Sequence, residues 1–306
     1  MLHLQNFVYG PVMPGLGFLV SCVGVFLGLR CVTRARACEG AARTRWLLLA
    51  GVSIGSIGVW AMDFVARLGF AVSGETARYN VPVTIASLLV AAVAVTSSLL
   101  IIERGEDESR TLSLGGLLAG LAVAVTHYLG MAAMRMPGRL SYFPALVLLS
   151  VALAIVAATA ALWAAARLRG IWATLGASLV LGVILCGVHY SAMAAVRMSR
   201  AKVPGGMVVG GGSGSTAQSL MLPVILCVSV VVFLVWAAIA LSPTEDAILY
   251  DAALLDYIRR RETRLGVKTG AQRASRKGYP ASFGNGASGG SPPEIIGGLH
   301  DWHEPP

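Results

Sequence analysis

Long apolar runs separated by short polar connections dominate the chain. Each run holds about 20 residues, which is long enough for an α-helix to cross a hydrocarbon core of about 30 Å. The pattern therefore predicts an all-α fold, an integral membrane seven-helix bundle. Its helices are expected at residues 12–32, 46–66, 82–102, 114–134, 144–166, 172–196 and 221–241.

Composition supports the same class of protein. Hydrophobic residues make up 56% of the 306 positions and charged residues 13%, whereas soluble domains carry about a quarter of charged residues. The mean hydropathy is +0.73. The predicted bundle is therefore expected to be embedded in a lipid bilayer, which is its main partner.

Positive charge is distributed unevenly over the connections between the apolar runs. If the N-terminus lies outside, the inner connections and the tail hold 17 Lys and Arg residues, and the outer connections hold 7. The positive-inside rule then predicts an external N-terminus and a cytoplasmic C-terminus. Topology accounts for the net charge of +9, so we expect no nucleic-acid partner.

Differences in composition predict three parts. Residues 1–241 form the seven-helix membrane domain. Residues 242–265 begin with Ser-Pro-Thr-Glu, which resembles a capping box with proline at the first helical position, and they predict a cytoplasmic amphipathic helix. A solvated continuation of the seventh helix is an equal alternative for this segment. Residues 266–306 are rich in Gly, Ser and Pro and predict a disordered cytoplasmic tail. A cytoplasmic signalling partner would contact residues 242–306.

One phrase recurs at the ends of alternate helices. The chain has THYLGMAAMRM from position 126 and VHYSAMAAVRM from position 188, and seven of the eleven positions are identical. A decayed copy, MDFVAR, begins at position 62. Asp63, His127 and His189 hold the matching positions, which are 64 and 62 residues apart. The repeat predicts a bundle built from three two-helix repeats plus one helix.

The predicted topology places these three side chains at one depth, near the outer face of the membrane. Ionisable groups in a membrane are costly and typically functional. Residues four apart share a helix face, so Met131 is expected beside His127 and Met193 beside His189. Imidazole suits copper, zinc and iron, and thioether selects copper(I). The pattern predicts a copper site with the metal ligands His127, His189, Met131, Met193 and Asp63.

Several of these residues also have simpler interpretations. A histidine in a membrane helix often forms core hydrogen bonds, and methionine fills gaps in packing. Asp63 lies four residues before Arg67, so the two form a candidate ion pair. Asp63 is equally a candidate for orienting an imidazole through a hydrogen bond. Cys186 and Cys227, in the sixth and seventh predicted helices, are interpreted as small apolar core residues.

The repeated phrase resembles the MHYT domain, a bacterial integral-membrane sensor module named after a Met-His-Tyr-Thr motif. The resemblance covers roughly residues 8–241 and implies a multi-pass protein of the bacterial inner cell membrane. It also implies copper binding through Met and His, and sensing of oxygen, carbon monoxide or nitric oxide. Asp63 and Arg67 stand where the family has His and Met. The matching residues are His127, Tyr128, Gly130, Met131, His189, Tyr190, Ala192 and Met193.

Members of that family often carry a cytoplasmic enzyme domain. Residues 242–306 contain no glycine-rich phosphate loop and no paired-carboxylate signature, so we expect this chain to signal through a partner and not to be an enzyme. Two other functions stay open. One is a haem-binding or redox protein with His127 and His189 as axial ligands. The other is a proton or ion transporter that uses Asp63 and the histidines as a relay.

Overall fold

A computed structural model describes residues 4–5, 10–68, 71–72, 78–104, 108–135, 139–168, 170–199, 215–242, 254 and 257–261. The chain divides into two units, residues 1–250 and residues 251–306. In the second unit, Leu254 and residues 257–261 are helical and exposed. Most of the predicted amphipathic helix 242–265 and all of the predicted disordered tail 266–306 lie outside the described residues.

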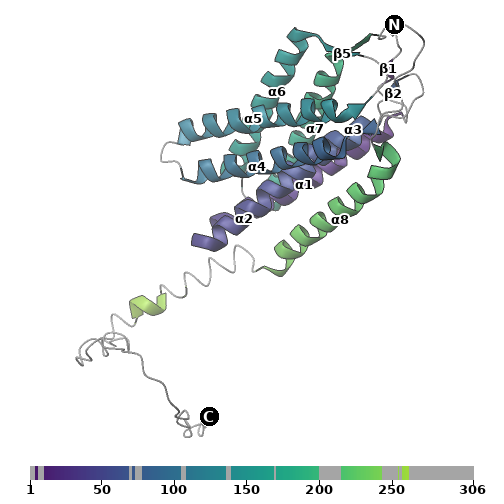
Figure 1. The fold of residues 1–306 in the computed structure, drawn as a ribbon. Helices are drawn as coiled ribbons and strands as arrows, with labels where there is room; N and C mark the ends of the chain where they lie inside the picture. Colours follow the sequence, from purple (N-terminus) through teal and green to yellow (C-terminus); the bar gives the residue numbers. More distant parts are fainter. Residues whose placement is uncertain are drawn as a thin grey trace, which may run out of the picture. The chain divides into compact units, whose positions relative to one another are not determined.

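Among the described residues of the first unit, seven helical spans are long and apolar enough to cross a membrane, which confirms the predicted bundle (Figure 1). The second span is composite, because an α-helix continues into a π-helix and then returns to α geometry. The orientation of the bundle in the membrane stays a prediction. The helices are α1 (Val12–Arg36), α2 (Gly40–Val52), η1 (the π-helix, Ser53–Ala61), α3 (Met62–Leu68), α4 (Val81–Arg104), α5 (Glu108–Ala133), α6 (Pro144–Arg167), α7 (Ile171–Ala194) and α8 (Ala217–Leu241).

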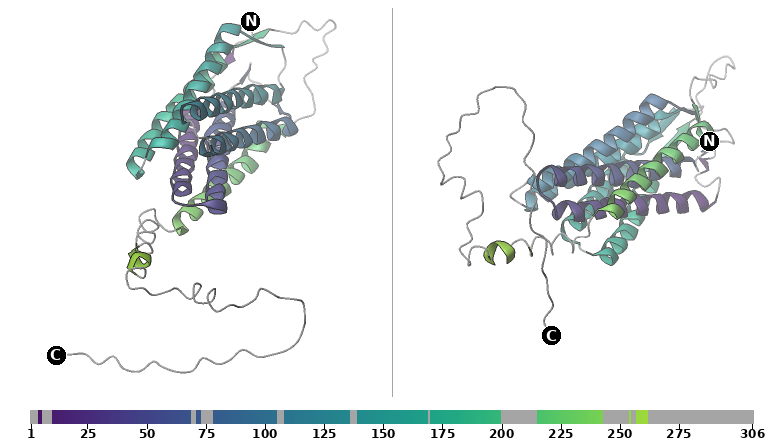
Figure 2. Two further views of the ribbon diagram at one scale, coloured as in Figure 1. Left: turned by 90° about the vertical axis from the view of Figure 1, so that its left-hand side faces the viewer. Right: turned by 90° about the horizontal axis from the view of Figure 1, so that it is seen from below.

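Six of the spans form a closed ring. Helix α1 packs against the second span, which packs against α4; α5, α6 and α7 follow in order, and α7 packs against α1. Helix α8 lies along the outside of this ring and packs on α1 and η1 (Figure 1 and Figure 2). The segments α3, α5 and α7, which end the three predicted repeats, therefore reach the same end of the bundle.

Short antiparallel strands join the connections at this end, and the sequence pattern did not predict them. They hold the loops after α3, α5 and α7 together, so they help to fix the helix ends that precede them. The pairs are β1 (Leu4–Gln5) with β2 (Ala71–Val72), β3 (Arg78–Tyr79) with both β4 (Met134–Arg135) and β7 (Ser215–Thr216), and β5 (Arg139–Tyr142) with β6 (Val196–Ser199).

Small residues let α1 and η1 cross at short range. A Cβ atom placed on Gly24 would lie 2.3 Å from the backbone nitrogen of Gly58. Ser53 Oγ also donates a hydrogen bond to the Gly24 carbonyl oxygen, at 2.9 Å. Such close backbone approach is typical of helix pairs in lipid, where the hydrophobic effect does not bring helices together and van der Waals packing and hydrogen bonds do. Since η1 leads directly into α3, this crossing fixes the position of Asp63.

Arg34 ties the last helix to the ring. This side chain is 4% exposed, near the end of α1. Its Nη1 donates to the carbonyl oxygen of Ser242 and its Nη2 to that of Ile239, both at 3.2 Å. The last carbonyls of a helix lack partners within the helix, and a cation near them is favourable. Arg34 therefore caps α8 from a neighbouring element.

Candidate metal centre

Three ionisable side chains meet inside the bundle, one from each repeat. Asp63 belongs to α3, His127 to α5 and His189 to α7, and their exposed fractions are 4%, 4% and 2%. Each lies five or six residues before the end of its helix. The predicted meeting of positions 63, 127 and 189 at one level is thus present in the structure. We call these three residues the triad.

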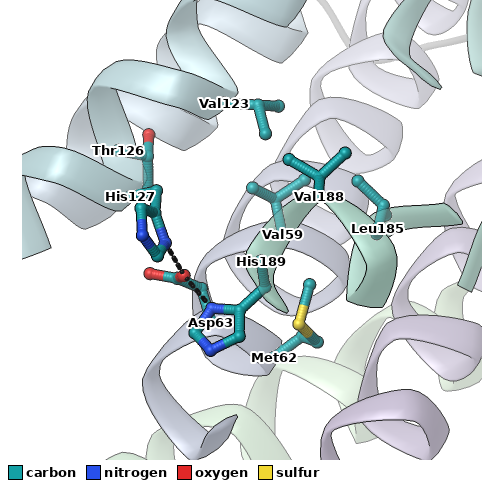
Figure 3. A pocket seen from close by; sticks show the side chains of 9 residues that line it. All are labelled: Val59, Met62, Asp63, Val123, Thr126, His127, Leu185, Val188 and His189. Atoms are coloured by element: carbon teal, nitrogen blue, oxygen red, sulfur yellow. Dashed lines mark hydrogen bonds and ion pairs between the residues drawn. The ribbon is translucent and has the colours of Figure 1, made fainter. Parts of the chain in front are cut away.

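A single carboxylate oxygen joins the two imidazoles. Asp63 Oδ1 lies 2.6 Å from Nδ1 of His127 and 2.7 Å from Nδ1 of His189 (Figure 3). An ionised carboxylate can only accept hydrogen bonds, so each Nδ1 carries the hydrogen. The two rings are nearly perpendicular, with centroids 5.1 Å apart. This geometry fixes the orientation of both rings and directs both Nε2 atoms away from the carboxylate.

The other carboxylate oxygen of Asp63 is paired with Arg67. Oδ2 lies 2.7 Å from Nη2, and Arg67 Nε donates to the Asp63 carbonyl oxygen at 3.1 Å. Arg67 is only 1% exposed. The sequence left two roles open for Asp63: an ion pair with Arg67, and a hydrogen bond that orients an imidazole. The structure shows both. The pair keeps the net charge of the buried site low.

Gly130 provides the space that Arg67 occupies. A Cβ atom at this position would lie 2.1 Å from Nη1 of Arg67. The third copy of the phrase has Ala192 at the matching position. No pattern in the sequence indicates this contact, because it joins the first copy of the phrase to the second.

We expect Gly130→Ala to displace the Arg67 guanidinium and to lower the free energy of unfolding by about 1–3 kcal/mol, the usual cost of overpacking. Thermal unfolding in one detergent measures the change. Gly187→Ala is the matched control on α7, since a Cβ atom there meets nothing within 4 Å. Equal melting temperatures for the two variants would contradict the tight fit at Gly130.

A cavity of about 10 Å³ borders the triad. That volume is close to the space of one water molecule or a small ion. Met62 supplies the thioether on its wall, whereas Met131 and Met193 pack in an apolar cluster with Trp60 and neighbouring side chains. Met62 was not among the predicted ligands, although it directly precedes Asp63. Figure 3 shows the wall, formed by Val59, Met62, Asp63, Val123, Thr126, His127, Leu185, Val188 and His189.

Tyr79 is buried close enough to Arg67 and Asp63 to interact with their charges. It lies in β3, outside the membrane-spanning helices, and is 1% exposed. Its ring packs on Phe64, with centroids 5.6 Å apart. Burial raises the pKa of its hydroxyl above the ordinary value, and the charge of Arg67 opposes this effect. Tyr79 therefore stays a neutral phenol at physiological pH, and spacing from the repeated phrase could not have identified it.

Comparison with known families decides the class of the domain. The sequence model of the MHYT family, described as a bacterial signalling protein N-terminal repeat, matches residues 57–115 and 120–178. The matched stretches begin at residues 57 and 120, so their spacing of 63 residues agrees with that of the repeated phrase. Residues 57–178 belong to the MHYT family. The match ends before His189, so the third MHYT copy rests on the phrase and on the geometry of the triad.

Curated relatives of this MHYT chain include two proteins of Pseudomonas aeruginosa and one of Caulobacter vibrioides. The bifunctional diguanylate cyclase/cyclic di-GMP phosphodiesterase MucR is 32% identical over 62% of this chain and 28% of its own length. The cyclic di-GMP phosphodiesterase NbdA is 36% identical over 66% of this chain and 26% of its own. An uncharacterized signaling protein of C. vibrioides is 35% identical over 58% of this chain and 22% of its own. The chain thus spans about a quarter of these relatives, and no solved structure matches it.

The MHYT triad combines donor types that suit a small transition-metal ion, and in this geometry each Nδ1 donates its hydrogen to Asp63. One ligand atom from each of the three residues lies within 4.8 Å of the others. Two imidazole nitrogens and a carboxylate oxygen suit copper, zinc or iron. His127 Nε2 is buried without a hydrogen-bond partner among the described residues, so its lone pair is available. The carboxylate between the rings and the small cavity leave no space for a porphyrin, so the geometry favours an ion over haem.

The cysteines contribute no ligand to this site. Among the described residues, the cluster of metal-binding side chains contains the triad alone. Cys186 is half-buried, in line with a packing role. The interpretation of Cys227 as a core residue was wrong, because this side chain is exposed on α8. Helix α8 lies outside the ring, so most of its faces have no protein neighbour to pack against.

Proposed function

We propose that this MHYT domain is a membrane-embedded sensor that binds one copper ion at the triad and responds to oxygen, carbon monoxide, nitric oxide or redox state. The observation that carries the proposal is the convergence of two histidines and one aspartate from three repeats on a single buried point. Such groups are costly inside a membrane and tend to be retained for function.

Copper, when bound, would supply a redox-active centre with affinity for diatomic gases. His127 and His189 would hold the ion through ring nitrogens. Asp63 would either add its oxygen or orient the rings, as carboxylates beside metal-bound histidines commonly do. Met62 faces the cavity, and Met131 and Met193 remain candidate thioether ligands from the repeated phrase. These soft donors favour copper(I) over zinc.

The output would leave the membrane domain after Leu241, through residues 242–306, to a cytoplasmic signalling partner. Two of the relatives are named as enzymes of cyclic di-GMP turnover. That class of signalling is therefore the first output to test. The membrane domain itself would act as the sensor and not as the enzyme.

Copper analysis of purified protein tests the proposal. The chain, purified with a histidine-free tag and loaded with copper(I), is expected to hold about one ion, since the site offers one set of converging donors. His127→Ala/His189→Ala is expected to hold none. His300→Ala/His303→Ala is the matched control, because it removes two histidines from the tail and leaves the triad unchanged.

Elemental analysis of the same samples for zinc and iron, and an absorption spectrum for a Soret band, identify any competing group. Copper-free wild-type protein after loading would exclude the proposal. Equal copper in the wild type and the double-histidine variant would place the ion elsewhere.

A further inference from the structure

A second cavity, far larger than the one at the triad, lies at the outer side of the ring. Its volume is about 370 Å³, and it separates α8 from α4, with η1 as its floor. Volumes of about 300–1,000 Å³ are typical of pockets that bind small molecules. None of the triad residues lines this cavity, so it is independent of the proposed metal site.

Two membrane-spanning helices present regular stripes to this cavity. Residues at helical spacing line one face of each, which shows that the cavity runs along the helices and not across them. On α4 these are Val81, Thr84, Ile85 and Leu88, and on α8 they are Leu220, Pro223, Val224, Cys227, Val228 and Val231.

The length of the cavity matches one leaflet of a bilayer. Along α8 it extends from Leu220 to Val231, which is roughly 16 Å at 1.5 Å per residue. Half of a hydrocarbon core of about 30 Å is about 15 Å. The cavity begins near the start of both α4 and α8, the end at which the short strands join the loops. It therefore reaches from one membrane surface to the middle of the hydrocarbon.

The wall offers an occupant almost nothing but hydrocarbon. The indole of Trp60 donates its hydrogen to Ser87 Oγ at 2.9 Å. The hydroxyl of Thr84 donates to the Asn80 carbonyl oxygen, also at 2.9 Å. The polar groups on this part of the wall are thus used within the protein. An elongated apolar occupant suits such a wall, whereas a polar head group would lose its hydrogen bonds there.

We propose that the cavity between α4, η1 and α8 holds one acyl chain of a membrane phospholipid. The surrounding bilayer supplies such chains in the leaflet that the cavity spans. A chain of this kind fills the space between α8 and α4, two helices that make few direct contacts with each other. The bound lipid is a structural ligand that fixes the last helix, and this assignment holds whether or not the triad binds copper.

Lipid retention in pocket-filling variants tests the assignment. Wild-type protein, purified from phospholipid membranes in a mild detergent, is expected to carry about one tightly bound phospholipid per chain in native mass spectra. Cys227→Trp on α8 and Ile85→Trp on α4 place an indole in the cavity. Each is expected to reduce the lipid-bound fraction at least fivefold. Both side chains are exposed to the cavity, so the substitutions leave the packed core intact.

Leu226→Trp and Leu89→Trp are the matched controls. Leu226 lies one residue before Cys227, and Leu89 lies one helical turn after Ile85. Both side chains are exposed and do not line the cavity, so each control adds the same indole outside it. They are expected to retain lipid as the wild type does. Circular dichroism and gel filtration establish that all four variants are folded. Equal retention in filling and control variants, wild-type protein without phospholipid, or an isoprenoid quinone as the retained molecule would overturn the proposal.

Discussion

Asp63→Asn is expected to lower the free energy of unfolding by about 3–5 kcal/mol, the usual effect of removing one partner of a buried ion pair. The substitution leaves the Arg67 guanidinium charged, 1% exposed and without its carboxylate. It also weakens the acceptor that His127 and His189 share. Denaturant or thermal unfolding of the purified protein in one detergent measures the loss.

A double-mutant cycle separates the ion pair from the other contacts of Asp63. Arg67→Met restores the residue type that the MHYT family has at this position, and alone it leaves the carboxylate without a counter-ion. Asp63→Asn/Arg67→Met removes both charges and is expected to recover more than half of the loss, because no buried charge is left unpaired. Additive effects of the two single substitutions would show that the pair contributes no coupling energy.

Gly24→Ala is expected to destabilise the bundle by about 1–3 kcal/mol, because the added methyl group would lie 2.3 Å from the Gly58 nitrogen and 2.7 Å from its Cα. Both atoms belong to the backbone, so the collision can be relieved only by moving α1 away from η1. That movement would also break the hydrogen bond from Ser53. The melting temperature and the copper content are both expected to fall, since η1 positions Asp63.

Gly176→Ala provides the comparison for this prediction. It makes the same substitution in α7, where the new methyl group meets nothing within 4 Å. Alanine in a helix is favoured over glycine by up to about 1 kcal/mol, so this variant is expected to be as stable as the wild type or more stable. If Gly24→Ala and Gly176→Ala had the same melting temperature, the close crossing of α1 and η1 would not contribute to stability.

Much of the fold was predictable because a membrane helix must satisfy its own backbone and expose apolar side chains to lipid. The seven apolar runs therefore located the seven spans. Their ends were less predictable: α2 begins at Gly40 and not at residue 46, and α5 begins at Glu108 and not at residue 114. Polar residues continue these helices beyond the apolar run. The π-helix and the short strands leave no comparable pattern of hydrophobic residues.

The meeting of the three triad residues was predictable from the sequence, and the hydrogen bonds between them were less so. The repeated phrase placed Asp63, His127 and His189 at one depth, and the closed ring then brings them together. Spacing along one helix cannot give the rotation of a neighbouring helix. For this reason the sequence did not show that one oxygen serves both histidines, or that Met62 lines the cavity. The roles of Met131 and Met193 as ligands stay predictions.

The sharing of one carboxylate among three helix ends links ligand affinity to folding. The triad exists only when α3, α5 and α7 are assembled, so a ligand held there would bind the folded chain and not the unfolded one. By mass action, a ligand at a hundred times its dissociation constant would add about 2.7 kcal/mol to the free energy of unfolding. Conversely, a chelator that removes the ligand would loosen all three repeats together, and heat denaturation would report occupancy without a spectroscopic label.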